Sequence, residues 1–600
     1  MVDLLAVLEN EFNAEHCLHN IAEIWNRDRW CRFSSFAQTA EFCHGQMLKA
    51  GLSQVESLAV PADGISAAGD WVVPRAWDVR SARLAVSPGG PVLADYEETP
   101  CSLVMYSAST SPEGVKATVA VVDDPEKASA ADITGKFLLT SMPPQALVSL
   151  AVQAGCPGIV SDHMPLYLAV RNSRRDVWNA TRWDNTFCVP ANNTGLFAFS
   201  LSPAVGQWLR NEHKQNPALE LHAKVDACAY NGRCHTVSGC IPGASPHPGE
   251  ILAYAHLYEP GAHDNASGAA MLLELARCLA AAIAAGRLPR PRHTLRFAMG
   301  WECAGSAAYC LAHPGRVAAG VAGLVADMVG AGEADNAVPT LWRNPLSNHS
   351  VCDVLMGDIL AACHSKKGVP WRERPFGIAT DNVLGDPCWQ MPTVALMAEP
   401  ALSYHLSIDT PDRISTKALL LNGMASGAYL LMLAGASAGW AGHMWGRAER
   451  DAGRLAQKVS GGLASEALEC EMRHAAAKSL TRLCPEWVPP PIQETVFPPA
   501  PATLRRQAEM VYRRIVPGCL TLHGRPELSG LRWQPAWNTA LHLPLFWTDG
   551  SRTLWQATVL AAAESGDCSG QRLARHLEEN LDFFRLLQEH GYIAECVQPQ

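Results

Sequence analysis

The chain has 600 residues, which predicts several domains because single hydrophobic cores stop growing near about 250–300 residues. With 48% hydrophobic and 18% charged residues, it can bury sizeable cores and is predicted to be globular. Its formal net charge of −10 argues against nucleic acid as the main partner.

No apolar run reaches the roughly 18 residues of a membrane span, so none is expected. The N-terminal stretch MVDLLAVLENEFN carries acids where a secretory signal has basic residues and a long apolar run. The twenty cysteines are scattered through apolar stretches such as AAYC and LARC, which favours buried thiols over disulfides. We therefore expect a cytoplasmic protein.

Residues 1–80 are predicted to be mainly helical, because LLAVLENEFN and FAQTAEFCHGQMLKAGL carry apolar residues at helical spacing. Residues 81–235 contain β-branched runs punctuated by Gly and Pro. Within them, KFLLT and GIVS predict two buried strands around an Ala-rich helix that ends at Gly155. This β-α-β pattern resembles the protease-associated (PA) domain that is often inserted into exopeptidases; another kind of α/β unit is the alternative.

Residues 236–435 alternate predicted strands and helices, which indicates a mostly parallel sheet. The predicted strands are EILAYAHLY, HTLRFAMGW, VAGLVADMV and PTVALMAE, and helical stretches such as SGAAMLLELARCLAAAIAAG separate them. We predict an α/β fold: a mixed, mostly parallel sheet with helices on both faces, beside the β-rich insertion.

Residues 436–600 are predicted to be helical, with a Pro-rich linker, CPEWVPPPIQETVFPPAPA, in the middle. The last part resembles a small winged-helix module. Such modules bind DNA, bind proteins or simply pack, and the acidic HLEENLDFF favours packing or protein contact, including self-association into a homo-oligomer. A regulator that binds nucleic acid through this end is a third hypothesis; the lack of a Lys/Arg stripe counts against it.

Polar residues follow the ends of the predicted strands in residues 236–435. In open α/β sheets, ligand sites form at the carboxyl ends of the strands. Any one of these residues has a structural explanation, such as helix capping. Together they offer the imidazole and carboxylate groups that zinc binds when no thiolate is available. They are His256, Asp264, Glu302, Asp327 and His405.

These residues lie in motifs that match a known family. GAHDNASG resembles the GAxDNxSG motif of the co-catalytic dizinc aminopeptidases and their carboxypeptidase relatives, peptidase family M28. ECAGSAAY, VADMVG, FGIATDN and YHLSIDTPDRI follow in the family's order. The resemblance covers residues 250–415 and implies a metal-dependent exopeptidase.

The resemblance also implies roles for the site residues. Asp264 would bridge two divalent ions, expected to be Zn²⁺, with His256 and Asp327 on one ion and His405 on the other. Such an ion pair polarises a peptide carbonyl and lowers the pKa of a shared water. Glu302 would take the proton of that water.

Two further acids, Asp381 and Asp409, are expected to hold hydrogen bonds or loop geometry around the site. Asn265 and Ser267 are expected to cap the following helix, and Gly268 to allow its close approach to the sheet. His263 is predicted to lie in a substrate pocket or at the surface, and His349 and His364 at the surface.

The sequence departs from the family pattern at two places. The first motif lacks the Asp that usually orients the metal pair, since His256 is followed by Leu-Tyr, and Glu259 replaces that Asp only in part. Where the family has two adjacent Glu, this chain has the single Glu302, with a Trp before it and Cys303 after it. If Glu302 is the base, Cys303 is a chemically reasonable substitute ligand or merely a buried thiol; if Glu302 is a ligand, the base is missing.

The leading hypothesis is a zinc-dependent exopeptidase, most simply an aminopeptidase acting on short peptides, with the insertion restricting entry to the cleft. The alternative is a catalytically silent relative that serves as a binding or regulatory protein. The decisive expectation is spatial: the metal-ligand residues must converge, although segments separated by up to 150 residues carry them.

Overall fold

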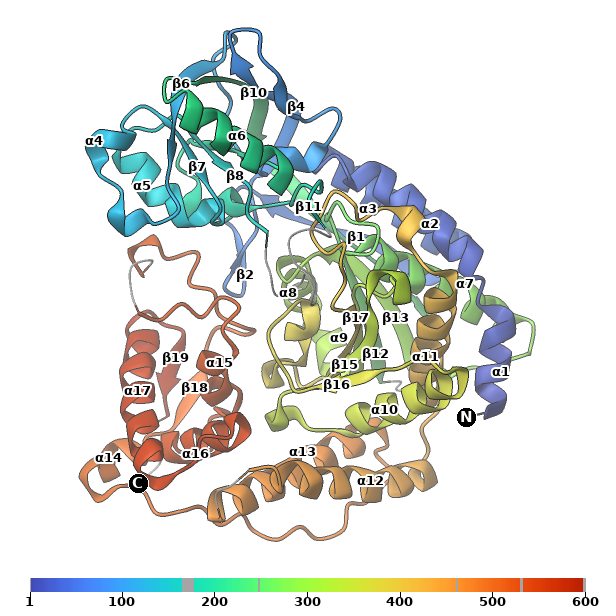
Figure 1. Cartoon of the computed structure of the whole chain (residues 1–600). Helices are drawn as coiled ribbons and strands as arrows, with labels where there is room; N and C mark the ends of the chain where they lie inside the picture. Colours follow the sequence, from blue (N-terminus) through green and yellow to red (C-terminus); the bar gives the residue numbers. More distant parts are fainter. Residues whose placement is uncertain (1, 165–176, 247–248, 460–461, 529–531, 597–600) are drawn as a thin grey trace.

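The computed structural model describes residues 2–164, 177–246, 249–459, 462–528 and 532–596 (Figure 1). Its centre is an eight-stranded sheet in the order β1-β11-β13-β12-β14-β17-β15-β16. The strands are β1 (Ser53–Ala62), β11 (Gly232–Ile241), β12 (Glu250–Leu257), β13 (Thr294–Trp301), β14 (Gly320–Ala326), β15 (Val338–Trp342), β16 (Arg372–Arg374) and β17 (Thr393–Glu399).

The middle of this sheet is parallel and its flanks are mixed. Strand β12 runs parallel to β13 and β14, and β14 runs parallel to β17. Strand β11 is antiparallel to β13, and β15 is antiparallel to β17. The mixed, mostly parallel sheet is therefore confirmed, and the four predicted strands are its four parallel neighbours. Their carboxyl ends share one edge, where ligand sites form.

Helices cover both faces of the sheet (Figure 1), with α7 and α11 on one side and α8 and α9 on the other. Helices α7 and α11 are long and apolar enough to cross a membrane, but 78% of each apolar window is buried inside the fold, as in core helices of globular proteins. The helices of this part are α7 (Ala266–Ala284), α8 (Ala304–Ala312), α9 (Pro314–Ala319), α10 (Val351–Cys363) and α11 (Thr416–Ala434).

Three N-terminal helices pack against this core: α1 (Val2–Glu11), α2 (Ala14–Asp28) and α3 (Phe33–Lys49). Helix α2 begins at the Asn13 cap, whose side chain accepts a hydrogen bond from the backbone N–H of His16. Its apolar face lies on α7, and the His16 ring contacts the buried Glu274 carboxylate at 2.6 Å. The helix thus ends at a fixed place beside the carboxyl edge of the sheet.

A second, seven-stranded sheet is inserted between β1 and β11, which pair antiparallel in the main sheet. The predicted β-α-β segment is present as β7-α5-β8, and the chain turns after the helix at Gly155, whose φ is +63°. Its identity as a PA domain stays a prediction. The inserted elements are β4 (Ala76–Ser87), β5 (Val92–Asp95), β6 (Val115–Val121), α4 (Ala130–Ile133), β7 (Phe137–Thr140), α5 (Val148–Gln153), β8 (Gly158–Ser161), β9 (Phe197–Ser200), α6 (Pro203–Gln215) and β10 (Glu220–Tyr230).

The C-terminal part continues with helices and a two-stranded sheet of β18 and β19. It is tied to the core by the buried Arg514–Asp386 ion pair at 2.6 Å. A hairpin of β2 (Ala67–Ala68) and β3 (Trp71–Val72) also reaches it through Asp70, which accepts hydrogen bonds from Thr521 and Tyr592. The winged-helix assignment stays a prediction. The elements are α12 (Ala438–Ala456), α13 (Leu463–Leu483), α14 (Arg505–Ala508), β18 (Tyr512–Arg514), α15 (Thr539–Phe546), α16 (Leu554–Ser565), α17 (Gly570–Glu589) and β19 (Ile593–Glu595).

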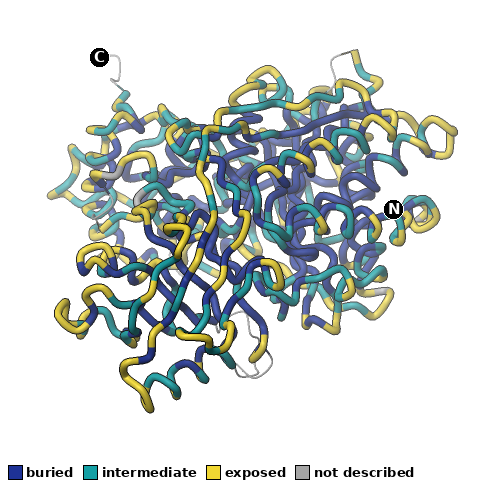
Figure 2. Tube along the Cα trace, turned by 90° about the horizontal axis from the view of Figure 1, so that it is seen from above, coloured by how far each residue is buried: buried dark blue, intermediate teal, exposed yellow. Residues whose placement is uncertain are grey.

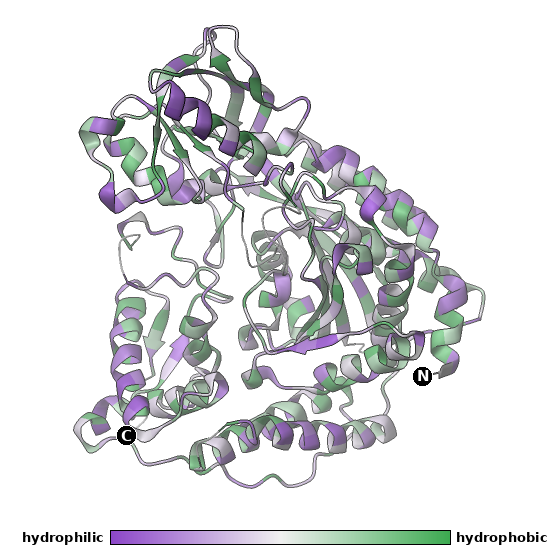
Figure 3. Cartoon of the chain, viewed as in Figure 1, coloured by the Kyte–Doolittle hydropathy of each residue, from purple (hydrophilic) through white to green (hydrophobic). Residues whose placement is uncertain are grey.

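Burial is concentrated in the interior of the chain trace, and exposed residues lie on the outer loops and outer helix faces (Figure 2). The hydropathy colouring agrees: the outer helices α12 and α17 alternate hydrophilic and hydrophobic residues (Figure 3), as amphipathic helices do. Cysteines such as Cys17, Cys43 and Cys234 are buried single thiols, as the sequence predicts.

Candidate metal centre

Four of the residues predicted to bind metal converge at the carboxyl edge of the central sheet. His256 lies near the end of β12, and Asp327 directly follows β14. Asp264 lies in the loop that enters α7, and His405 in the loop after β17. His256, Asp264 and Asp327 are at most 4% exposed. The predicted spatial convergence is therefore present.

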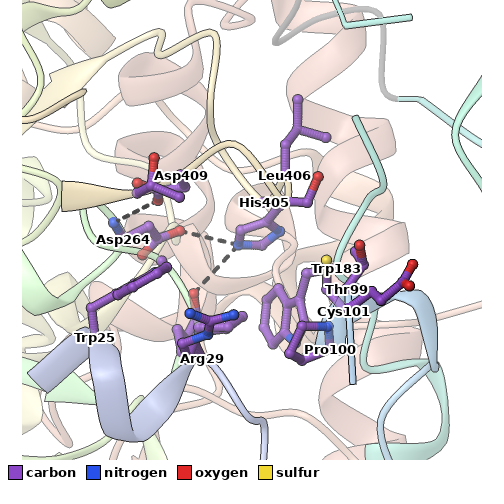
Figure 4. Close-up of a pocket in the computed structure, with 16 residues that line it drawn as sticks. Trp25, Arg29, Thr99, Pro100, Cys101, Trp183, Asp264, His405, Leu406 and Asp409 are labelled. Carbon is purple, nitrogen blue, oxygen red and sulfur yellow. Dashed lines mark hydrogen bonds and ion pairs between the residues drawn. The ribbon is translucent and has the colours of Figure 1, made fainter. Parts of the chain in front are cut away.

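The two carboxylate oxygens of Asp264 face two different histidines, and Figure 4 shows the contact with His405. Its Oδ1 lies 3.7 Å from Nε2 of His256, and its Oδ2 lies 3.1 Å from Nε2 of His405. His256 Nε2 is also 3.4 Å from Oδ1 of Asp327. Asp264 thus lies between two groups of possible metal ligands, which we call half-sites. The first contains His256 and Asp327, and the second contains His405.

Glu259 completes the second half-site. Its Oε2 lies 3.5 Å from Nε2 of His405, and ligand atoms of His256, Glu259 and Asp264 all lie within 4.8 Å of one another. Sequence reasoning gave Glu259 only a partial role and offered the thiol of Cys303 as the extra ligand. Cys303 instead lies in the hydrophobic core, and its backbone N–H donates to Asp381. The geometry favours Glu259 over Cys303.

These spacings fit a metal centre. Ligand atoms about 2.0–2.1 Å from a tetrahedral zinc ion are about 3.3 Å apart, close to the separations in both half-sites. Oδ1 of Asp327 is buried and, apart from its 3.4 Å contact with Nε2 of His256, has no partner in the described part of the chain. Burial of a carboxylate oxygen without a hydrogen bond is costly unless a cation compensates it. The donor set of imidazoles and carboxylates is one that zinc accepts.

The acids at the site also favour a bound positive charge. Burial, together with Asp264, raises the pKa of Glu259 to about 7, against the opposing effect of His405. Burial lowers the pKa of His405, but the carboxylates of Asp264 and Glu259 outweigh it and raise the value to about 9. Both shifts favour the protonated forms of these groups. Divalent cations would displace those protons on binding.

Strained backbone accompanies the site loops. Four residues that are not glycine have positive φ: Tyr258 (75°), Cys303 (55°), Met328 (50°) and His405 (56°). The first three are direct neighbours of Glu259, Glu302 and Asp327, and the fourth is itself a site residue. Such conformations are unfavourable for L-residues and persist where the surrounding structure imposes them, often at functional sites.

Hydrogen bonds hold the loops that carry the acids. Asp409 accepts the backbone N–H groups of His263 at 2.7 Å and Asp264 at 3.1 Å. Asn265 caps α7 by accepting from the N–H of Gly268 and accepts another hydrogen bond from Met328. Ser267 accepts from the N–H of Val329 rather than capping the helix. The motif after Asp264 therefore joins its loop to the loop of Asp327.

Gly268 allows the close helix–sheet approach that the sequence predicts. An added Cβ would lie 2.2 Å from the carbonyl oxygen of Ala326 and 2.4 Å from Oδ1 of Asn265. We expect Gly268→Ala to cost about 1–3 kcal/mol by overpacking and to lower the melting temperature in a thermal-shift assay. The control is Gly439→Ala in α12, where a Cβ meets no atom within 4 Å. Equal melting temperatures for both variants would contradict the prediction.

Glu302 lies beside the two half-sites without contacting either histidine. A small second cavity, of about 40 Å³, is lined by Glu302, Glu259, Tyr258 and Trp301. In the described part of the chain, the carboxylate of Glu302 lies within 4 Å of no histidine ring nitrogen, unlike those of Asp264, Asp327 and Glu259. Burial raises the pKa of its carboxyl well above the ordinary value, although His256 opposes the shift. This placement favours a proton acceptor over a ligand.

Two further acids hold the turns beside Glu259 and Glu302. Asp381 accepts hydrogen bonds from the N–H of Cys303 at 2.8 Å and the hydroxyl of Ser306 at 2.6 Å, as expected for a loop-positioning acid. Asp28, at the end of α2, accepts from the N–H of Tyr258 at 3.4 Å. Nothing in the sequence pattern marks Asp28, because it lies far outside the motifs.

The predictions for three other histidines are wrong. His263 is 1% exposed; its Nε2 lies 3.0 Å from the carbonyl oxygen of Ala398, and its Nδ1 accepts backbone N–H groups. His349 and His364 are also buried; Nε2 of His349 lies 3.3 Å from the carbonyl oxygen of Ala448, and Nε2 of His364 lies 3.0 Å from Oδ1 of Asn422. A lone imidazole in a polar-looking segment is therefore a poor indicator of exposure here, because polar groups from distant parts of the chain bind it inside the fold.

Residues 236–429 match the family model described as Peptidase family M28. This segment is an M28 peptidase domain. It carries the residues of both half-sites, and the match makes the chain a peptide hydrolase. A search by sequence found no match among curated proteins.

The M28 domain and its surroundings are also similar to solved structures. Two structures of BSAP, a zinc aminopeptidase from Bacillus subtilis, match with 18% and 17% sequence identity and a TM-score of 0.51 each. They cover 70% of this chain, and 94% and 95% of their own chains. At this identity the similarity establishes a shared fold, which agrees with the mixed sheet described above.

Proposed function

We propose that the protein is a zinc-dependent exopeptidase that acts as an aminopeptidase on short peptides. His256 and Asp327 would hold one ion, His405 and Glu259 the other, and Asp264 would bridge them. The observation that carries this proposal is that the two oxygens of Asp264 face two separate histidines. The BSAP structures, which share the fold, are of a zinc aminopeptidase.

The metal ions and the side chains of the protein would supply different parts of the hydrolysis. Two zinc ions bound there would polarise the peptide carbonyl and activate a water. Glu302 accepts the proton of that water and passes it to the leaving amine. Its position beside both half-sites suits the task, because desolvation raises the pKa of its carboxyl above the ordinary value and so makes the carboxylate a stronger base.

The main cavity supports a small substrate. It has a volume of about 220 Å³ and opens beside Glu259, Asp264 and His405. The inserted unit contributes Pro100 and Trp183 to its wall. A folded protein cannot enter a cavity of this size, whereas the end of a short peptide can.

Metal analysis and peptide hydrolysis test the proposal together. We expect about two zinc ions per chain, release of p-nitroaniline from aminoacyl p-nitroanilides, and loss of that activity with chelator. N-acetylation of the substrate should abolish cleavage, because an aminopeptidase needs the free amine. Cleavage of N-acetylated peptides at a free C-terminus would instead identify a carboxypeptidase. A chain without bound zinc and without hydrolysis would support the silent binding protein.

A cytoplasmic location remains our proposal, and the buried single thiols support it. Self-association through the C-terminal part and the expectation that nucleic acid is not a partner stay predictions from the sequence. Light scattering of the purified protein tests self-association, and a duplex-binding assay at low salt tests nucleic-acid binding.

A further inference from the structure

The main cavity contains a charged residue that the proposed hydrolysis does not use. Arg29, directly after α2, lines the cavity together with Glu259, Asp264 and His405. In Figure 4 it lies between Trp25 on one side and Trp183 and Pro100 on the other. It is the one basic residue other than histidine among the residues that line the cavity in the described part of the chain.

Aromatic rings hold the Arg29 side chain. The guanidinium carbon lies 4.6 Å from the ring centroid of Trp25 and 5.0 Å from that of Trp30. Stacking of this kind stabilises a cation through the face of the guanidinium group. The N–H donors at its edge stay available for a planar, bidentate contact with a carboxylate. The side chain is half-buried, so such a contact is only partly screened by solvent.

Arg29 has no ion-pair partner among the acids that the structure describes. Within the described residues, no carboxylate lies within 4.0 Å of its nitrogens, whereas neighbouring Arg27 is paired with Glu23 at 3.0 Å. Most acids that line the cavity are already occupied. Glu259 and Asp264 contact His405, and Asp409 accepts backbone N–H groups. The fourth acid, Glu98, is exposed at the rim and makes no ion pair with Arg29.

Arg29 and its aromatic neighbours lie outside the family match. The residues of both half-sites belong to 236–429, but Arg29, Trp25 and Trp183 come from α2 and from the inserted unit. This wall of the cavity therefore comes from segments outside the matched domain. A residue in such a wall acts on the choice of substrate rather than on the reaction common to the family.

We propose that Arg29 binds a carboxylate of the peptide substrate and selects peptides that present one next to the scissile bond. The carboxylate comes either from an acidic first side chain or from the C-terminus of a dipeptide. The inference rests on the proposed peptidase function and adds a substrate class to it. Arg29 is a specificity residue and takes no part in proton transfer.

Two matched substrate pairs test the proposal and separate the two sources. Glutamyl and glutaminyl p-nitroanilide differ in a side-chain carboxylate, and the dipeptide Leu-Gly and its amide differ in the terminal one. We expect the zinc-loaded wild type to prefer the charged member of one pair by about 10- to 100-fold in kcat/KM, mainly through KM. Arg29→Gln should remove that preference, and Arg29→Lys should restore part of it.

Arg32→Gln is the matched control. Arg32 also lies over Trp30 and donates to the hydroxyl of Tyr96 at 3.0 Å, but it does not line the cavity. Its replacement removes the same charge and should keep the preference. A wild type without preference in either pair, or an Arg29→Gln variant that keeps the preference, would overturn the proposal. So would an equal loss in Arg32→Gln.

Binding measurements keep this inference separate from the proposed function. The same four compounds are titrated calorimetrically into Glu302→Gln protein, with and without Arg29→Gln. Tighter binding of a charged member that disappears with Arg29→Gln supports the carboxylate site even if the wild type hydrolyses nothing. Hydrolysis of the neutral members without any Arg29-dependent binding supports the peptidase function and refutes the carboxylate site.

Discussion

Replacing Glu302 by glutamine is expected to lower kcat by about 10²- to 10⁴-fold, the usual contribution of a general base. Glutamine keeps the shape of the side chain but cannot accept a proton. Glu302 has no contact within 4 Å of a histidine nitrogen in the described part of the chain and faces the cavity that it shares with Glu259. The variant should therefore retain both zinc ions. Steady-state hydrolysis of an aminoacyl p-nitroanilide and elemental analysis of the same sample measure the two effects.

The metal content decides what a loss of activity means. An inactive Glu302→Gln protein with about one ion per chain would make Glu302 a ligand rather than the base. A variant that keeps full activity would assign the proton transfer to another group. Both results would leave the M28 fold untouched, because the match to the family does not depend on Glu302.

Replacing Glu259 by alanine is expected to reduce bound zinc from about two ions to about one per chain and to abolish most hydrolysis. The half-site of His405 would then keep only Asp264 as a second protein ligand. The half-site of His256 and Asp327 stays complete. Elemental analysis after dialysis against limiting zinc measures the loss.

Cys303→Ser is the matched control for Glu259→Ala. The thiol of Cys303 lies in the hydrophobic core, so serine should keep both ions and cost only some stability. The opposite pattern, with one ion lost in Cys303→Ser and two retained in Glu259→Ala, would restore Cys303 as the ligand that the sequence suggested.

The sequence predicted the parts of the site that local pattern determines. Asp264, with the Asn-Ala-Ser-Gly that follows it, forms one continuous loop and helix start, so its motif is visible in the chain. His256 and Asp327 end strands whose apolar runs are long and fully buried. The parallel centre of the sheet followed from the same runs.

The parts that the sequence did not reveal depend on long-range contacts. Strand β1 is mostly half-buried or exposed and β16 is exposed, so neither has the pattern of a buried strand. Glu259 acts through the backbone turn at Tyr258, whose positive φ no propensity indicates. Asp28 and Arg29 reach the site only because α2 packs on α7. Tertiary packing places these residues at the site, and no local sequence pattern indicates it.

The inserted unit also contacts the loop of His405 directly. The backbone N–H of Trp183 donates to the carbonyl of His405 at 2.8 Å, and that of Ser407 donates to Thr181 at 2.8 Å. The rings of Trp183 and His405 meet edge to face at 4.6 Å. An ion that stabilises the His405 loop would therefore also stabilise docking of the insertion, and docking would favour binding of that ion by the same free energy. Zinc should then slow proteolysis at the junctions of the insertion.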